Sequence, residues 1–260
     1  YPHLHIVGEC WTRPASAVAY WQTGVKNYNG FDSHLPSVMD FPVEEAIRQA
    51  LEKDGKQWGE GLTRVYDAVA MDYLYGDVNN ILLMLGNHDM DRIADVVMNQ
   101  DPRRVKIAYT LLATMRGIPQ VFYGDEYAMK SADRRMGHST LRMPLPLGEA
   151  VTAEMQDMFD YQSRLFQWRK GEKVIHTGRT MHFMSRDNTY AYFRYNDEEA
   201  VFVFVNASDA DRTIPTAHYA EILGKYKPVG VDVISGKTYD LSQKDITIEP
   251  LSSIVVKLTK

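Results

Sequence analysis

Apolar and polar positions repeat with two different spacings along this chain, and the change comes near residue 172. Before that point, short apolar runs are separated by segments in which apolar residues recur every three or four positions. Between Asp101-Pro102 and Gly117, for example, the positions with helical spacing are Val105, Ala108, Leu111, Leu112 and Met115. Such alternation of strands and helices is typical of a parallel sheet or barrel, so the first half is expected to have an α/β fold.

Four apolar runs in this first half are expected to be strands, and five segments are expected to be helices. The strands are predicted near 3–9, 37–40, 81–86 and 119–123. The helices are predicted directly after Arg13, with Pro14 in the first turn, and near 43–54, 60–75, 102–116 and 152–170. Parallel barrel strands present active-site residues at their carboxyl ends, so the residues after each run are the first candidates for chemistry.

Beyond Gly171 the pattern becomes β-rich. The runs 189–195, 200–205, 228–234 and 253–258 are rich in Val, Ile, Tyr and Phe, and they are separated by turn residues. This pattern predicts an antiparallel sandwich over 173–260, following a partial barrel over 1–172. The second domain has no clustered catalytic side chains, and a structural role is expected for it.

Composition narrows the classes of protein that fit. The 260 residues are 45% hydrophobic and have a net charge of -5, which argues against a nucleic-acid partner. No apolar stretch approaches the roughly 20 residues of a membrane span, and no signal-like segment is present, so the chain is expected to be soluble. The single cysteine, Cys10, excludes an internal disulfide and a Cys-rich zinc site.

The first candidate for chemistry is Glu9, at the end of the strand predicted near 3–9. Beside Trp11, partial desolvation would favour the protonated carboxyl, which suits a general acid. The alternative is an ordinary strand-end glutamate in an ion pair with Arg13. Glu9 alone does not decide between the two.

The second candidate is the triplet Asn87-His88-Asp89, which closes the run at 81–86. An adjacent imidazole and carboxylate are able to hydrogen-bond sugar hydroxyls, and the carboxylate is able to stabilise an oxocarbenium-like transition state. The alternative is a loop in which Asn87 and Asp89 cap local backbone around a satisfied histidine. Asp91 and Arg92 follow directly and are expected to form a local ion pair at the rim.

Four segments carry a family resemblance in their order along the chain: 7–11, 33–41, 85–92 and 117–126, with the sequences VGECW, SHLPSVMDF, LGNHDMDR and GIPQVFYGDE. They resemble the fifth to eighth barrel strands of the α-amylase superfamily. The likeness is greatest to the Bacteroides-type neopullulanase and cyclomaltodextrinase group. The β-rich tail is similar to the domain that follows the barrel in these enzymes.

By that resemblance, Glu9 is the general acid/base and Asp89 is the carboxylate that stabilises the transition state. His88, Trp11 and Arg92 are expected to bind substrate, and Trp11 matches an aromatic platform for a sugar face, the alternative being a core tryptophan. The implied substrates are α-1,4-linked maltooligosaccharides, cyclodextrins or pullulan. No cofactor and no metal are expected, and the implied location is the periplasm.

The resemblance also implies a catalytic nucleophile that these residues lack. In the family, this carboxylate lies on the fourth barrel strand, and the chain resembles the fold from the fifth strand onward. The segment Gly30-Phe31-Asp32 is superficially similar to the nucleophile motif, but it lacks the arginine and precedes the sixth-strand motif. We therefore expect the 260 residues alone to have no appreciable glycosidase turnover. Near the rim, Arg142 fits the family pattern, but Pro144 replaces its usual acidic partner.

Four strands cannot close a barrel, because a whole (β/α)8 barrel takes eight strands and roughly 250 residues. The outer strands are expected to have unpaired edges and to expose an apolar face. That face is expected to pack against the N-terminal half of the barrel or against a second copy of the chain. The competing class is a non-catalytic relative, either glucan-binding or transporter-associated, although the presence of Glu9, His88 and Asp89 argues against loss of catalysis.

Overall fold

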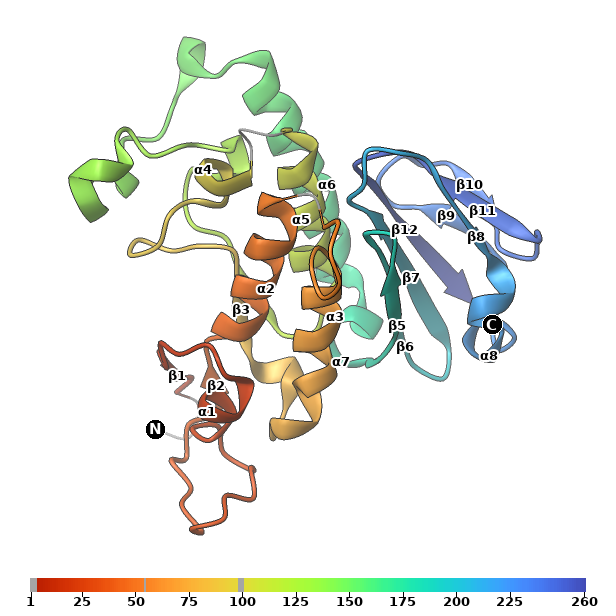
Figure 1. Ribbon diagram of the computed structural model, residues 1–260, viewed down its shortest axis with the longest axis horizontal. Coiled ribbons are helices and arrows are strands. Elements are labelled where there is room, and N and C mark those ends of the chain that lie inside the picture. The colour runs from red at the N-terminus through yellow and green to blue at the C-terminus, as the bar shows by residue number, and fades with distance from the viewer. Residues whose placement is uncertain (1–3, 54, 98–100) are drawn as a thin grey trace.

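A computed structural model describes residues 4–53, 55–97 and 101–260, except for the side chains of 134–137. Helices and short parallel strands make up the first part of the chain, and an antiparallel sheet makes up most of the second (Figure 1). This arrangement confirms the predicted fold class, a partial barrel followed by a β domain.

The barrel segment contains four short strands, β1 (Val7–Gly8), β2 (Ser37–Val38), β3 (Leu82–Met84) and β4 (Ile118–Gln120). Strand β1 pairs in parallel with β2, and β3 pairs in parallel with β4. A parallel bridge between Met39 and Leu82 connects the two pairs, so the four strands follow one another in chain order. The predicted strands are thus confirmed in shorter form; the start of the one predicted near 3–9 lies outside the described residues.

The helices of the first half cover the outer side of these strands. They are α1 (Ala15–Ala19), α2 (Phe41–Glu52), α3 (Thr63–Ala70), α4 (Ile93–Val97), α5 (Arg103–Thr114), α6 (Ala153–Gly171) and α7 (Lys173–Thr177). Short 3-10 segments connect them: η1 (Met71–Leu74), η2 (Val78–Asn80), η3 (Asp125–Tyr127), η4 (Arg134–Leu141) and η5 (Gly148–Ala150). The segment 60–75, predicted as one helix, is α3 followed by η1, and α4 was not predicted.

Side-chain caps explain where the longer helices begin. The Asp40 carboxylate accepts a hydrogen bond from the backbone N–H of Val43 (3.2 Å) at the start of α2. The Thr152 hydroxyl accepts one from the N–H of Met155 at the start of α6. Asp101 accepts one from the N–H of Arg103 (2.8 Å) at the start of α5. The residues just before each of these helices therefore mark where it begins.

The β domain is built on a six-stranded sheet with the order β10-β9-β12-β7-β6-β5. Its strands are β5 (Arg179–Arg186), β6 (Thr189–Tyr195), β7 (Glu199–Asn206), β9 (Val229–Asp232), β10 (Thr238–Asp240) and β12 (Ser252–Thr259). A second, two-stranded sheet pairs β8 (Arg212–Pro215) with β11 (Asp245–Ile248), beside η6 (Thr216–Tyr219) and α8 (Ala220–Leu223). Four of these strands were predicted; β5, β8, β10 and β11 were not.

The central strands β6 and β7 of the six-stranded sheet are buried on both faces, which accounts for their near-continuous apolar sequences. On β6, Tyr190 and Tyr192 belong to the core formed with α2, α3, α5 and α6, whereas Ala191 and Phe193 face a second core with α8 and β11. This alternation follows the period of two that strands impose. One hydrophobic core therefore runs from the barrel helices into the β domain, although the predicted boundary near residue 172 itself stays a prediction.

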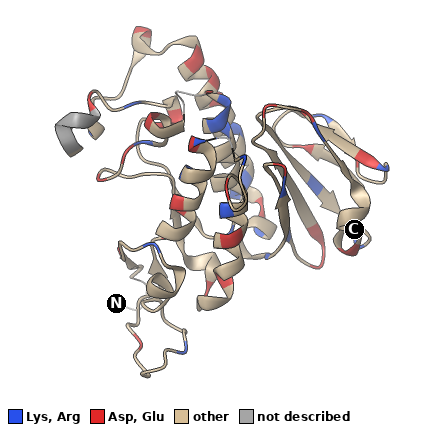
Figure 2. Cartoon of the chain, viewed as in Figure 1, with Lys and Arg blue, Asp and Glu red and all other residues tan. Residues whose placement is uncertain are grey.

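Acidic and basic residues are interspersed along both halves of the chain (Figure 2). Within the part of the chain that the structure describes, no helix is both long enough and apolar enough to cross a bilayer.

Candidate active site

The candidate site lies where the four parallel strands end. Glu9 follows β1 directly, Asn87-His88-Asp89 follow β3 by a few residues, and Tyr123 to Asp125 follow β4. The carboxyl ends of parallel strands meet at one edge of a sheet, so these side chains share that edge. The predicted placement of both candidate carboxylates at strand ends is therefore what the structure shows.

Glu9 is exposed, and among the described residues it has no ion pair or side-chain hydrogen bond. The alternative pairing with Arg13 is wrong, because Arg13 forms an ion pair with Glu45 of α2. Glu9 is an accessible carboxyl group with no competing partner, and its role as general acid stays a prediction.

Trp11 lies on the same edge, half exposed. The residue is 48% exposed, and its ring stacks on Phe41, the first residue of α2, with ring centroids 5.1 Å apart and planes 26° apart. The alternative of a core tryptophan is therefore wrong. A supported ring with accessible surface is suited to stacking against the apolar face of a sugar.

The triplet after β3 has features of both interpretations of its sequence, the backbone-capping loop and the exposed histidine–carboxylate pair. Asn87 is buried and caps local backbone, since its side-chain oxygen accepts a hydrogen bond from the N–H of Asp89 (2.8 Å). The Asp89 carboxylate points elsewhere, toward the His88 ring, with Nε2 and Oδ2 3.2 Å apart. Asn87 thus fixes the turn that presents His88 and Asp89.

Two residues from the segment after β4 also reach Asp89, and sequence reasoning did not place them there. Arg142 donates from Nη2 to Asp89 Oδ1 (2.9 Å), and His138 Nδ1 lies 3.3 Å from the same oxygen. Asp89 is 30% exposed, and its three partners are about half exposed or more. The carboxylate is therefore held by several cationic or imidazole groups and still faces solvent.

Arg92 lies beneath this edge and does not line it. Its side chain is fully buried and pairs with Asp125 (Nη1 to Oδ1, 2.7 Å), while its guanidinium stacks over the Phe122 ring at 4.5 Å. It also donates to the carbonyls of Tyr123 and Leu141, each at 2.8 Å. The substrate-binding role expected for Arg92 stays a prediction, and this burial favours a supporting role.

Burial raises the pKa of Asp125 to about 6, against the opposing effect of the Arg92 guanidinium. Asp32, the superficially similar acid near the sixth strand, behaves differently. It is exposed, and the hydrogen bond from the backbone N–H of His34 (2.8 Å) lowers its pKa. Asp32 caps its own loop, and its dismissal as a nucleophile stays a prediction.

The described residues contain no group of three or more His, Cys, Asp or Glu side chains that could hold a metal ion. The site is thus organised around carboxylates, imidazoles, one arginine and one exposed indole.

Parallel strands that present acidic side chains at one edge, with helices outside them, define the class: a barrel-type catalytic fold, here joined to a β domain. Models of two known families match the sequence. The alpha amylase catalytic domain matches residues 1–212, and the cyclo-malto-dextrinase C-terminal domain matches residues 180–257. The chain belongs to the α-amylase family, as its strand-end motifs predicted.

Curated relatives are similar over part of their length. A cyclomaltodextrin glucanotransferase of Geobacillus stearothermophilus is 25% identical over 203 residues, covering 72% of this chain and 26% of the relative. An α-amylase of Niallia circulans is 26% identical over 224 residues, covering 81% of this chain and 40% of the relative. The chain therefore spans about a quarter to two-fifths of the length of these relatives.

Solved structures have the same fold. An α-amylase from Geobacillus thermoleovorans, solved in complex with acarbose, superposes with a TM-score of 0.76 at 18% identity over 98% of this chain and 53% of that one. An α-amylase from H. orenii gives a TM-score of 0.71 at 20% identity over 99% of this chain and 54% of that one.

Proposed function

We propose that this chain supplies the general acid/base, Glu9, and the transition-state-stabilising carboxylate, Asp89, of a retaining α-glucan hydrolase. The observation that carries the proposal is the shared edge: Glu9, which has no partner among the described residues, and the half-exposed Trp11 follow β1, and the multiply bonded Asp89 follows β3. Glycoside hydrolysis needs such a pair of roles, one group to protonate the leaving oxygen and others to stabilise an oxocarbenium-like centre.

The substrate proposal is an α-1,4-linked maltooligosaccharide, cyclodextrin or pullulan, cleaved by an enzyme of the neopullulanase or cyclomaltodextrinase type. The match of 180–257 to a cyclo-malto-dextrinase C-terminal domain supports the cyclodextrin-active group. The matched relatives include both glucanotransferases and α-amylases, so hydrolysis and glucan transfer are the two outcomes that a product assay has to separate.

The mechanism assigns one step to each side chain. Trp11 stacks against a sugar on the leaving-group side, and His88 hydrogen-bonds the sugar at the cleavage position. Glu9 donates its proton to the glycosidic oxygen as the bond to the anomeric carbon breaks, and Asp89 stabilises the positive charge that develops. A retaining enzyme also needs an attacking carboxylate about 5–5.5 Å from the acid, and none is assigned within these residues.

The attacking carboxylate is therefore proposed to lie on the fourth barrel strand, supplied by polypeptide outside these 260 residues. The two outer strands, β1 and β4, support this arrangement. In and next to them, apolar side chains are exposed that a closed barrel would cover: Leu4, Ile6, Val7, Ile118 and Val121. A second copy of the chain is the alternative occupant. The location proposed for the whole enzyme is the periplasm, which cell fractionation would test.

The direct test compares three samples on pullulan, β-cyclodextrin and maltoheptaose. The 260-residue polypeptide alone is expected to show no turnover. The full-length enzyme, or this chain combined with a polypeptide that carries strands one to four, is expected to be active. Light scattering reports whether the combination forms a one-to-one complex. Turnover by the 260 residues alone at rates near those of the full-length enzyme would overturn the proposed division of roles.

The acid role is tested by Glu9→Gln in the active form. General acid catalysis contributes roughly 10²- to 10⁴-fold, so kcat is expected to fall by about that factor, with less change in KM. Glu60→Gln, on the segment before α3, is a matched control. Unchanged kcat in Glu9→Gln would remove Glu9 from the mechanism.

A non-catalytic glucan-binding role is the second candidate, favoured by the exposed ring of Trp11. Calorimetry of the 260-residue chain with maltoheptaose separates the two. Tight binding that is lost in Trp11→Ala, together with an inactive full-length protein, would favour the binding module. A transporter-associated relative would share that outcome.

A further inference from the structure

In the segment after β4, the backbone carbonyl groups on either side of Arg142 each accept a hydrogen bond from a side chain nearer the strands. The carbonyl of Leu141 accepts a hydrogen bond from Arg92 Nη2 (2.8 Å), and the carbonyl of Met143 accepts one from the Tyr123 hydroxyl (2.8 Å). The residue between these two carbonyls is Arg142. Its backbone is thus held on both sides, while its side chain extends from an otherwise irregular stretch.

The first of these attachments is rigid because Arg92 is itself fixed. Its side chain has no solvent exposure, and Nη1 binds both the Asp125 carboxylate (2.7 Å) and the Tyr123 carbonyl (2.8 Å). Arg92 therefore uses one amino group to stay on the barrel and the other to hold Leu141. A planar guanidinium with fixed donors suits such a bridge, which lysine could not reproduce.

The held arginine points at the candidate catalytic carboxylate. Arg142 Nη2 lies 2.9 Å from Asp89 Oδ1, whereas His88 Nε2 lies 3.2 Å from the other oxygen, Oδ2. His138 Nδ1 is also near Oδ1, at 3.3 Å. Two residues after Arg142 the chain has Pro144, which offers no carboxylate, so the guanidinium has no acidic neighbour on its own segment at that position.

We propose that Arg142 is a positioning residue for the Asp89 carboxylate, and that Arg92 and Tyr123 act through it by anchoring the carbonyls on either side. The proposal rests on the function proposed above for Asp89. Arg142 and His88 hold opposite oxygens of the carboxylate, which fixes its plane relative to the sugar. A displacement of about 1 Å at a reacting group is able to cost about 100-fold in rate.

The kinetic test uses the catalytically active form on maltoheptaose. In Arg142→Gln we expect kcat to fall by about 10- to 100-fold with KM changed much less, since the carboxylate loses orientation and no substrate contact is removed. Tyr123→Phe keeps the ring and loses one hydrogen bond, so a smaller fall in kcat of about two- to tenfold is expected. Arg142→Lys is expected to recover only part of the loss.

The matched control is Arg179→Gln, because Arg179 is an exposed arginine of β5 paired with the exposed Asp197. It is expected to leave kcat and KM unchanged. Thermal unfolding of each variant excludes a general loss of folding. If Arg142→Gln has the kcat of the wild type, or if its loss is entirely in KM, Arg142 does not position Asp89.

A second measurement does not depend on activity and uses the 260-residue chain. The ¹⁵Nε–¹Hε signal of Arg142 is expected to differ from those of exposed arginines in the wild type. It is expected to move to their position in Asp89→Asn and partly toward it in Tyr123→Phe. An Arg142 signal that Asp89→Asn leaves unchanged overturns the inference. An inactive full-length wild type would overturn the proposed function instead, with this signal still reporting the contact.

Discussion

The barrel segment meets its surroundings along two borders that differ in kind. Toward the β domain the border is closed, and three of its arginines, Arg116, Arg169 and Arg194, are buried and hydrogen-bonded. Along the strand ends and the outer strands the border is open, and its apolar side chains are exposed: Leu4 (62%), Ile6 (48%), Trp11 (48%) and Ile118 (46%). The barrel segment is therefore covered by the β domain at one border, whereas the apolar side chains at its other border are left uncovered.

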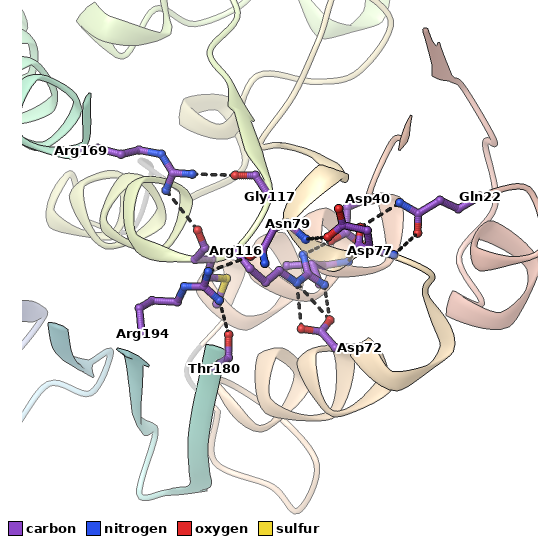
Figure 3. A network of polar contacts seen from close by, with 12 residues as sticks. Gln22, Asp40, Asp72, Asp77, Asn79, Arg116, Gly117, Arg169, Thr180 and Arg194 are labelled. Carbon is purple, nitrogen blue, oxygen red and sulfur yellow. Dashed lines mark hydrogen bonds and ion pairs between the residues drawn. The ribbon is translucent and has the colours of Figure 1, made fainter. Parts of the chain in front are cut away.

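Three arginines complete the closed border (Figure 3). Arg116, before β4, forms ion pairs with Asp40 and Asp72. Arg169 of α6 donates to the carbonyls at the end of α5, including Ala113 (2.7 Å). Arg194 of β6 reaches across the border to the Asn79 side chain (2.8 Å) and the Ile175 carbonyl (2.9 Å).

The closed border is therefore the place to test stability, and the open border is the place to test function. Removing one partner of a buried charge pair is strongly destabilising, so substitutions at this border are expected to cost stability. The open edge carries Glu9, Trp11 and Asp89, whose side chains remain accessible. The β domain is therefore more than an appendage in structural terms, since the barrel helices share its core and its polar contacts.

The largest expected effect is on stability, at the closed border. Arg116→Met leaves the fully buried Asp40 carboxylate without its cation, and breaking a buried pair in this way costs about 3–5 kcal/mol. On the open border, Ile118→Ser changes a half-exposed side chain and is expected to alter stability by no more than about 0.5 kcal/mol. Urea unfolding of the 260-residue chain measures both. Equal losses in the two variants would contradict the distinction between the borders.

Sequence patterns predicted the elements whose signals are local. Strand β6 spans Thr189–Tyr195 as expected, because its apolar residues are bounded by turn residues. Helix α5 was expected because Asp101 caps it and Gly117 follows it. Strand β5 was missed, since its sequence RTMHFMSR mixes charged and apolar residues at an edge of the sheet.

The candidate site was predictable to the same degree. Glu9 and Asp89 follow apolar runs, and that local signal placed both at strand ends. The contacts of Asp89 with His138 and Arg142 span 49 and 53 residues through an irregular segment, and no periodic pattern reports such a pairing. The burial of Arg92 could not be predicted from local sequence either, because its partner Asp125 lies 33 residues away.

A smaller effect concerns the buried pair beneath the open edge. Burial raises the pKa of Asp125 to about 6, above the ordinary 3.8, so the folded state binds more protons than the unfolded state between these values. Its contribution to stability is therefore expected to fall as pH rises from about 4 to about 6, by about 3 kcal/mol. Asp125→Asn is expected to lack this slope, whatever its overall stability.

Unfolding free energies from urea titrations at several pH values between 4 and 7 measure this difference. Asp197→Asn, at an exposed and weakly paired carboxylate, is the control and is expected to keep the wild-type slope. If wild type and Asp125→Asn have parallel pH profiles, the Arg92 pair outweighs burial, and this position behaves like the fully compensated ion pairs of the closed border.

The smallest effect tests the closed border through His182 of β5. Its Nδ1 lies 3.0 Å from the Tyr190 hydroxyl, and its ring stacks on Tyr66 of α3, with centroids 4.8 Å apart. Burial lowers the pKa of His182, so the folded state resists protonation of this ring. The stability that follows is present above the unfolded value of about 6.5 and is lost as pH falls from there toward the lower folded value.

His182→Gln is therefore expected to be less sensitive than the wild type to a fall from pH 7 to pH 5. His218→Gln, at an exposed histidine of η6, is expected to keep the wild-type profile. The same urea titrations supply the measurement. A His182→Gln profile parallel to the wild type would mean that water reaches this ring in the folded state, and the border between α3 and the sheet would then be less tightly closed than the one around Arg116.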